Sequence, residues 1–190
     1  MIVTVPHGLC KENYNKKNHL CDLVAKSSGE YIYEGLKKGG IDVVLLIPEV
    51  TREAIDMNRE ISRNTKFRME VNEAMKDKLI LWDIHSYPAM KDPPFTNDVY
   101  ILDNLKNPKN YSVDLCKRFK DEGFKCEIYV GKNNDITNLA REKGLISLLL
   151  EICEDLEKEE REKICSVFVD WVLKKYSGSS HIPSKRRKNL

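Results

Sequence analysis

The sequence predicts an α/β protein with three layers, in which a mainly parallel mixed sheet lies between two layers of helices. Short apolar runs rich in β-branched residues alternate along the chain with longer segments of helical periodicity. Several of these runs are apolar at nearly every position, which is typical of strands covered on both faces. Without a repeat or linker before position 177, the 190 residues predict one domain, 1–176, followed by a flexible basic tail, 177–190.

Composition narrows the class of protein. Hydrophobic residues make up 41% of the chain and charged residues 33%, as in ordinary globular proteins. The chain lacks an apolar run long enough to cross a bilayer and a signal-peptide pattern at its start, so we expect a cytoplasmic protein without a membrane partner. The net charge of +2 is concentrated in the tail. A near-neutral body does not fit a nucleic-acid binder, although the tail could contact nucleic acid.

The six cysteines are scattered and form no C-x-x-C pair. In a chain of this size and expected compartment, they predict reduced, mostly buried thiols. A cysteine-rich zinc site is therefore not expected.

The first half of the chain predicts two strand–helix units. Residues 1–5 form a β-branched run that a proline ends, and residues 41–47 form a second buried strand. Between them a helix is expected over 19–38, because apolar residues recur at helical spacing behind Asn18, a suitable N-cap. A glycine pair ends this helix. After an irregular segment, residues 60–76 have helical composition.

The next strand, residues 78–84, ends abruptly in residues that can carry chemistry. His85, Ser86 and Tyr87 follow it directly, and Pro88 prevents the strand from continuing inside the sheet. In open α/β sheets, reactive groups gather just outside the carboxyl ends of the strands. We therefore expect His85 at a functional edge of the sheet.

The second half continues the alternation. A proline-rich loop is followed by strands and helices whose ends are marked by glycine or polar residues. The predicted strands are 98–102, 124–130 and 145–150, and the predicted helices are 111–122, 136–143 and 156–176.

Three polar residues occupy equivalent positions, each after a predicted strand: His7, His85 and Glu151. Parallel strands would place all three at one edge of the sheet. Two neutral imidazoles and one carboxylate form the ligand set of many catalytic zinc sites. A carboxylate after a buried strand needs a neighbouring cation, a hydrogen-bond donor or a catalytic role. We assign Glu151 as the general base and acid. The pattern predicts one zinc ion per chain, bound by His7, His85 and a carboxylate.

The carboxylate ligand can be Asp22 or Glu12. Asp22 is preferred because it falls in the first turn of the helix after His7, facing the same edge, whereas Glu12 lies in an open loop. His19 is a third candidate ligand, because it shares a helix face with Asp22. Its position is more typical of a surface residue or of one that contacts a ligand from behind. An acid in a first helical turn also compensates the helix dipole, which is the alternative role of Asp22.

A second polar cluster precedes the expected helix at 60–76. The guanidinium of Arg59, beside Asn58, is a forked donor suited to a substrate carboxylate, and Asp56 could orient it. Asp83 lies two residues before His85 on the same strand face and could support that ligand. Near the same strand end, Ser86 and Tyr87 could donate hydrogen bonds to the substrate, although Tyr87 could equally be a packing residue.

These motifs together resemble the N-formylglutamate amidohydrolase family, within the zinc carboxypeptidase-like hydrolases. The resemblance consists of His7-Gly8 after a first strand, Asp56-x-Asn58-Arg59, Asp83-x-His85-Ser86 and Leu150-Glu151-Ile152, with an aspartate in the helix after His7. It covers roughly residues 3–152. The His-x-x-Glu motif usual in metallocarboxypeptidases is absent, since Gly8-Leu9-Cys10 follows His7.

The resemblance implies a zinc carboxypeptidase-like fold and zinc-dependent hydrolysis of an amide bond in a small substrate that bears a carboxylate. It implies zinc on His7, Asp22 and His85, proton transfer by Glu151, and substrate binding by Asn58 and Arg59. An N-acyl or N-formyl amino acid and a peptide C-terminus are both suitable substrates. The alternatives are a peptidase or cell-wall amidase of the same class, and a catalytically inactive binding module with the same fold.

Overall fold

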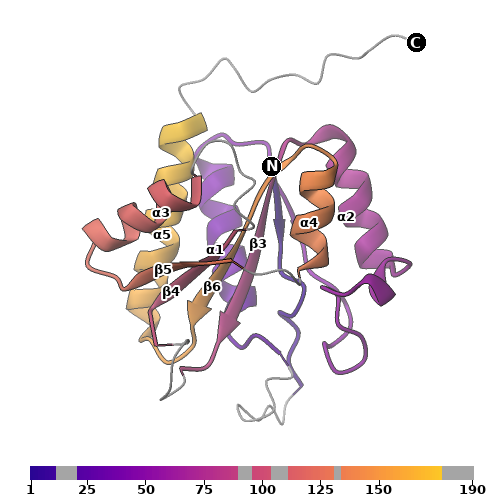
Figure 1. The fold of residues 1–190 in the computed structure, drawn as a ribbon, viewed down its shortest axis with the longest axis horizontal. Helices are drawn as coiled ribbons and strands as arrows, with labels where there is room; N and C mark the ends of the chain where they lie inside the picture. The colour runs from indigo at the N-terminus through magenta and orange to yellow at the C-terminus, as the bar shows by residue number, and fades with distance from the viewer. Residues whose placement is uncertain (12–20, 90–95, 104–110, 131–133, 177–190) are drawn as a thin grey trace.

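A single twisted sheet lies between two layers of helices (Figure 1). The computed structural model describes residues 1–11, 21–89, 96–103, 111–130 and 134–176. Helices α1, α3 and α5 cover one face of the sheet, and α2 and α4 cover the other. The predicted three-layer α/β/α architecture is confirmed. The predicted tail lies outside the described residues.

The strands are short at the margins of the sheet and long at its centre. They are β1 (Ile2–Thr4), β2 (Val44–Leu46), β3 (Ile80–Tyr87), β4 (Val99–Leu102), β5 (Cys126–Tyr129) and β6 (Ile146–Cys153). The helices are α1 (Ala25–Lys38), α2 (Lys66–Asp77), α3 (Tyr111–Asp121), α4 (Asp135–Glu142) and α5 (Lys158–Tyr176), with a 3₁₀ turn, η2 (Glu60–Ser62), before α2.

The strand order is β2-β1-β3-β6-β4-β5. The first four of these strands are mutually parallel, β4 runs antiparallel to β6, and β5 is parallel to β4. The mainly parallel mixed sheet is thus confirmed. Strands β3 and β6 are paired along their whole length, from Ile80 opposite Ile146 to Tyr87 opposite Cys153. The carboxyl ends of β1, β3 and β6 consequently meet at one edge.

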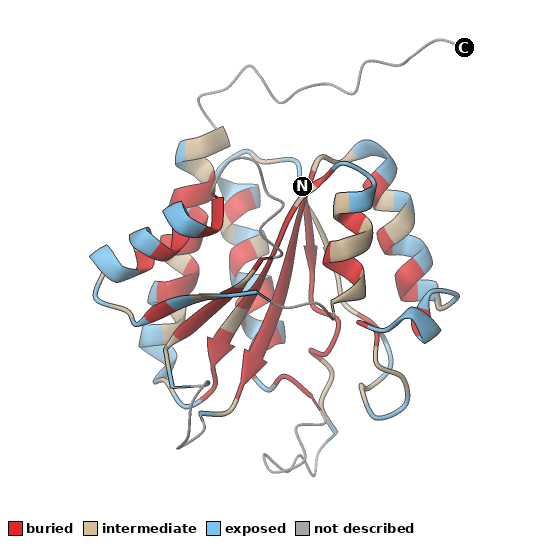
Figure 2. Cartoon of the chain, in the orientation of Figure 1, coloured by how far each residue is buried: buried red, intermediate tan, exposed pale blue. Residues whose placement is uncertain are grey.

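Alternating side chains of the strands supply two separate cores. Val3, Trp82 and Leu148 point into the larger core beneath α1, α3 and α5. Ile2 and Leu81 point into the smaller core beneath α2 and α4. The strands of the sheet are mostly buried, whereas the outer faces of the helices are exposed (Figure 2). Burial on both faces explains why these strands are apolar at nearly every position.

Several element boundaries differ from the prediction. The first helix begins at Ala25 rather than at 19, so Asp22 lies in the turn before it; Asn18 lies outside the described residues. The expected helix at 60–76 is a 3₁₀ turn followed by α2, whose N-cap Thr65 accepts a hydrogen bond from the Arg68 amide. This cap stops the helix from extending back to Glu60.

The predicted reduced state is wrong for two of the six cysteines. Cys10 and Cys21 form a disulfide, whereas the other four are free and buried. The Cα atoms of Cys10 and Cys21 are 5.3 Å apart, a proximity that their spacing in the sequence does not reveal. In the described part of the chain, no helix combines the length and the apolar character that crossing a membrane requires.

Candidate metal and catalytic site

A cavity of about 480 Å³ opens at the carboxyl ends of β1, β3 and β6. One part of its wall is polar and charged, and the other part is apolar. The lining residues are His7, Asp22, Arg52, Asp56, Asn58, Arg59, His85, Leu102, Tyr129, Val130, Asn134, Leu149 and Glu151. Seven of the ten residues to which the sequence assigned a role are among them.

His7, Asp22 and His85 meet in the polar part of this cavity. Each offers one potential ligand atom, and these atoms all lie within 4.8 Å of one another. The Oδ2 atom of Asp22 is 2.6 Å from Nδ1 of His85 and 3.4 Å from Nδ1 of His7. The two imidazole rings pack edge to face with 4.9 Å between their centroids. All three side chains are buried, so neighbouring groups rather than bulk solvent fix their positions.

The far nitrogen of His85 is held by two side chains. Nε2 lies 2.8 Å from the Asn58 side-chain amide and 3.2 Å from Oδ2 of Asp83. Asp83 in turn accepts hydrogen bonds from the Thr4 hydroxyl at 2.6 Å and from Nδ2 of Asn134 at 2.8 Å. Nε2 can accept from Nδ2 of Asn58 only when it carries no proton; when the proton is on Nε2 and points at Asp83, the lone pair of Nδ1 is available to an ion.

His7 is supported in the same way. Its Nε2 lies 2.7 Å from Oδ1 of Asp56, and that oxygen also accepts a hydrogen bond from the Asn58 backbone amide at 2.9 Å. The Nδ1 atom of His7 is buried and has no hydrogen-bond partner among the described residues. A buried ring nitrogen that makes no hydrogen bond and lies 3.4 Å from a carboxylate oxygen, beside a second imidazole, suits a metal ligand.

The electrostatics of the cluster favour a cation. Burial alone would lower the pKa of His85, but the negative charges of Asp83 and Asp22 raise it well above 6.5. Burial would likewise raise the pKa of Asp22, yet its contacts with His85 and His7 hold that pKa far below its usual range. The cluster therefore retains a carboxylate and attracts positive charge to the imidazoles. The residues present fit a divalent zinc ion, which takes two histidines and one carboxylate.

Glu151 lies beside these groups in β6, directly opposite His85 in the strand register. It is not at the end of the strand as predicted, because β6 continues to Cys153. Burial raises the pKa of Glu151 to about 7, although the nearby His85 opposes this shift. A carboxyl group that exchanges protons near neutral pH and faces the cavity has the properties of a general base and acid.

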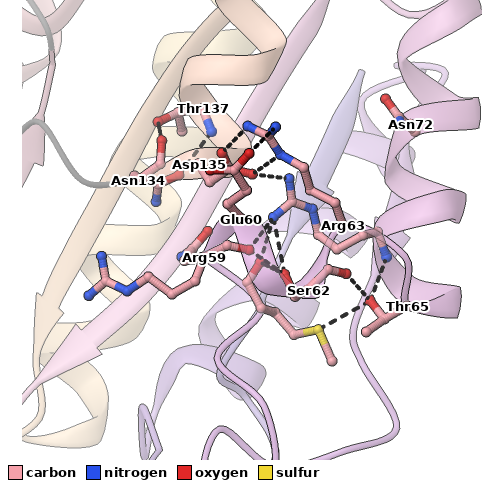
Figure 3. A network of polar contacts seen from close by, with 12 residues as sticks. Arg59, Glu60, Ser62, Arg63, Thr65, Asn72, Asn134, Asp135 and Thr137 are labelled. Carbon is pink, nitrogen blue, oxygen red and sulfur yellow. Dashed lines mark hydrogen bonds and ion pairs between the residues drawn. The ribbon is translucent and has the colours of Figure 1, made fainter.

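The loop that carries Asn58 and Arg59 is anchored to the start of α4. The backbone carbonyl of Met57 accepts hydrogen bonds from the buried guanidinium of Arg68 at 2.8 Å and from the Ser62 hydroxyl at 3.0 Å. Arg68 and Arg63 both pair with Asp135, at 2.5 and 2.6 Å. Figure 3 shows this network, with the Arg59 side chain pointing away from it.

The two residues of the predicted Asn58-Arg59 pair are placed differently. Asn58 is buried behind His85 and contacts its ring, so the Asn58 side chain supports the histidine. Arg59 is half exposed, lines the cavity and places its Nε 3.3 Å from Oδ2 of Asp56. Asp56 therefore contacts both Arg59, which the sequence expected it to orient, and His7.

Two predicted substrate-binding residues lie outside the cavity lining. Ser86 points to the opposite face of β3 from His85, where its hydroxyl donates to Glu154 and accepts the Val24 amide. Tyr87 packs against Tyr100, and its hydroxyl donates to the backbone of Asn97. The structure thus brings neither residue into the cavity: because β3 continues through Tyr87, the strand alternation turns Ser86 away from it, and Tyr87 packs against Tyr100 instead.

Three residues of the site were not identified from the sequence. Arg52 lies 3.6 Å from both Asp22 and Asp56, in a loop without a motif. Glu154 is buried and accepts the Leu23 amide at 2.7 Å, which fixes the turn beside Asp22. Asn134 caps α4 through the Thr137 amide and donates to Asp83; an asparagine before a helical segment was the available signal. Glu12 and His19 lie outside the described residues.

Comparisons with known proteins identify the fold. No protein-family model and no curated protein matches the sequence. Among solved structures, a gene product of Agrobacterium tumefaciens is similar at 15% identity and a TM-score of 0.68, over 94% of this chain and 90% of that one. N-formylglutamate amidohydrolase from Ralstonia eutropha is similar at 13% identity and a TM-score of 0.64, over 93% of both chains.

A third similar structure is the catalytic domain of an N-acetylmuramoyl-L-alanine amidase from Bacillus (Paenibacillus) polymyxa. It shares 13% identity at a TM-score of 0.58, over 94% of this chain and 98% of that one. The fold is therefore the one found in these amidases and in N-formylglutamate amidohydrolase, as the motifs implied.

Proposed function

We propose that this protein is a zinc-dependent hydrolase that cleaves an amide bond in a small substrate bearing a carboxylate, such as an N-acyl amino acid or a peptide C-terminus. One observation carries the proposal: His7, Asp22 and His85 converge beside Glu151 in one cavity that also contains a half-exposed arginine. The fold shared with amidohydrolases and amidases supports this reaction class.

His7, Asp22 and His85 would hold the zinc ion, the two histidines through Nδ1. When bound, zinc activates water and polarises a carbonyl group. The role of the surrounding residues is orientation: Asp56 fixes the ring of His7, and Asp83 with Asn58 fixes the ring of His85. Such supporting contacts keep ligands in place and set their basicity.

Glu151 performs the proton transfers. It takes a proton from the water that attacks the carbonyl carbon, and then delivers a proton to the nitrogen as the carbon–nitrogen bond breaks. The products are a carboxylic acid and an amine, so every atom of the added water is accounted for. A carboxyl group with a pKa of about 7 can serve in both directions near neutral pH.

Among the lining residues that the structure describes, Arg52 and Arg59 carry permanent positive charges. Arg59 binds the substrate carboxylate, because its guanidinium is half exposed and borders the cavity. Arg52 lies deeper, between Asp22 and Asp56, where it can offset negative charge that develops on the carbonyl oxygen. The substrate is consequently an acylated amino acid or a short peptide.

The test is a screen of zinc-loaded protein against N-formyl and N-acetyl amino acids and short peptides, with amine release as the readout. We expect hydrolysis that stops when zinc is removed by a chelator and returns when zinc is added. A protein that binds no zinc and hydrolyses none of these compounds would be the inactive binding module instead. Replacement of Arg59 by Ala should raise KM for carboxylate substrates more than for their amides.

A further inference from the structure

The wall of the cavity over β6, β4 and β5 is apolar. Leu149 pairs with Leu102 across β6 and β4, and Leu102 pairs with Tyr129 across β4 and β5. Because residues paired in register share a face of the sheet, these three side chains form one continuous row. All three line the cavity, together with Val130. The row continues from Asp83, which pairs with Leu149, so the apolar wall begins beside the metal-site residues.

Two members of this wall are unusually exposed for their type. Tyr129 is 46% and Val130 51% exposed, whereas the side chains on the other face of β5 pack into the larger core. Apolar groups at the border of a cavity, beside charged groups that can orient a ligand, are the composition of a small-molecule site. The wall is therefore suited to cover an apolar part of whatever reaches the zinc ligands.

The charges around the wall disfavour a second carboxylate on the ligand. Among the described lining residues, the cations are Arg52 and Arg59, and both lie against Asp56. Glu127 is exposed two residues before Tyr129, on the same face of β5, where it adds negative charge next to the wall. A glutamate side chain placed there would meet leucine, tyrosine and valine near a like charge.

We propose that Leu102, Tyr129, Val130 and Leu149, termed here the apolar wall, bind an aliphatic or aromatic group of the substrate. The preferred substrates are then N-acyl amino acids with an apolar group, rather than N-formylglutamate. The inference rests on the proposed function and names its substrate class. The apolar group can belong to the amino-acid side chain or to the acyl chain, since both flank the scissile amide.

The experiment compares kcat/KM of the zinc-loaded protein for five compounds. N-formylglycine is the reference, N-formylleucine and N-formylphenylalanine test the side-chain source, N-hexanoylglycine tests the acyl source, and N-formylglutamate is the polar comparison. We expect at least one apolar compound to exceed both N-formylglycine and N-formylglutamate by about tenfold or more, the effect of filling a hydrophobic pocket. The compound that gains identifies the source.

Substitutions then locate the effect. Tyr129→Lys and Val130→Lys change exposed residues, so the fold should persist, and each should reduce the ratio of apolar to glycine activity about tenfold. Val113→Lys is the matched control, because Val113 is 54% exposed on α3 and does not line the cavity. It should leave the ratio unchanged.

Three outcomes would overturn the inference. If N-formylglutamate is the best of the five substrates, or if both lysine variants keep the wild-type ratio, the apolar wall does not select the substrate, while the proposed amide hydrolysis stands. If none of the compounds is hydrolysed by zinc-loaded protein, the proposed function fails, and this inference fails with it.

Discussion

Asp22 and His85 are 63 positions apart in the chain, yet Oδ2 of Asp22 lies 2.6 Å from Nδ1 of His85. The same oxygen also approaches Nδ1 of His7, at 3.4 Å. Each histidine thus directs one nitrogen at Asp22 and the other at a different carboxylate, Asp56 or Asp83. A set of donors with each ring held from behind is the usual construction of a protein zinc site.

The zinc content of the protein should depend on His85. Wild-type protein should carry about one zinc ion per chain after dialysis, and the His85→Ala variant should carry almost none, because two remaining ligands hold zinc poorly. Elemental analysis measures the ratio, and circular dichroism confirms the fold. The control is Val113→Ala, on the exposed face of α3. A His85→Ala protein with full zinc occupancy would show that His85 is not a ligand.

The support given by Asp56 can be tested separately. Asp56→Asn should keep the fold but weaken zinc affinity by about 10–100-fold, because an amide holds the Nε2–H group of His7 less strongly than a carboxylate. Competition with a chromophoric chelator measures the affinity. Glu60→Gln is the control, since Glu60 is an exposed carboxylate in the following turn. Equal affinities in Asp56→Asn and wild type would contradict the assigned role.

Glu151→Gln should separate metal binding from turnover. The glutamine cannot transfer protons, so kcat should fall by about 10²–10⁴-fold while zinc content stays at the wild-type level. Glu73→Gln is the control and should retain kcat, because Glu73 is an exposed carboxylate on α2 that does not line the cavity. Turnover of the Glu151→Gln protein at the wild-type rate would remove Glu151 from the mechanism.

We expect the two arginines that pair with Asp135 and anchor the Asn58-Arg59 loop to contribute differently to the free energy of unfolding. Arg68 is 2% exposed and also binds the Met57 carbonyl, so Arg68→Ala should lower the free energy of unfolding by about 3–5 kcal/mol. Arg63 is 44% exposed, so Arg63→Ala should cost about 0–1 kcal/mol. Urea denaturation measures both. Similar losses for the two variants would refute the distinction.

The lowered pKa of Asp135 makes the free energy of unfolding depend on pH. Its burial would raise the pKa, but hydrogen bonds from Arg63 and Arg68 outweigh this and hold the pKa below 3.8. A depressed folded-state pKa means that the carboxylate stabilises the fold above about pH 4 and loses this contribution as pH falls through the lowered value. The stability difference between wild type and Asp135→Asn should therefore shrink in acid.

Urea denaturation at pH 7 and at about pH 2.5 measures that difference. Asp77→Asn, at the exposed end of α2, serves as the control and should give little difference at either pH. A difference between wild type and Asp135→Asn that is the same at both pH values would contradict the prediction.

The sequence by itself determined the layers of the fold and the principal ligand candidates. Continuous apolar runs predicted strands buried on both faces, and the position of a histidine directly after such a run predicted its place at the sheet edge. Gly40 and Gly123 adopt positive φ after α1 and α3, where the sequence predicted helix ends. These features depend on local periodicity and on residue type, so one chain segment at a time suffices to predict them.

Tertiary structure alone decided which side chains reach the cavity. The strand at β3 runs three residues further than its apolar pattern, because pairing with β6 satisfies the backbone of polar residues as well as apolar ones. That continuation turns Ser86 away from His85. Arg52, Glu154 and the Cys10–Cys21 disulfide depend on how loops return to the sheet, which periodicity does not encode. The apolar wall likewise exists only through the register of β6, β4 and β5, which brings together residues that lie far apart in the sequence.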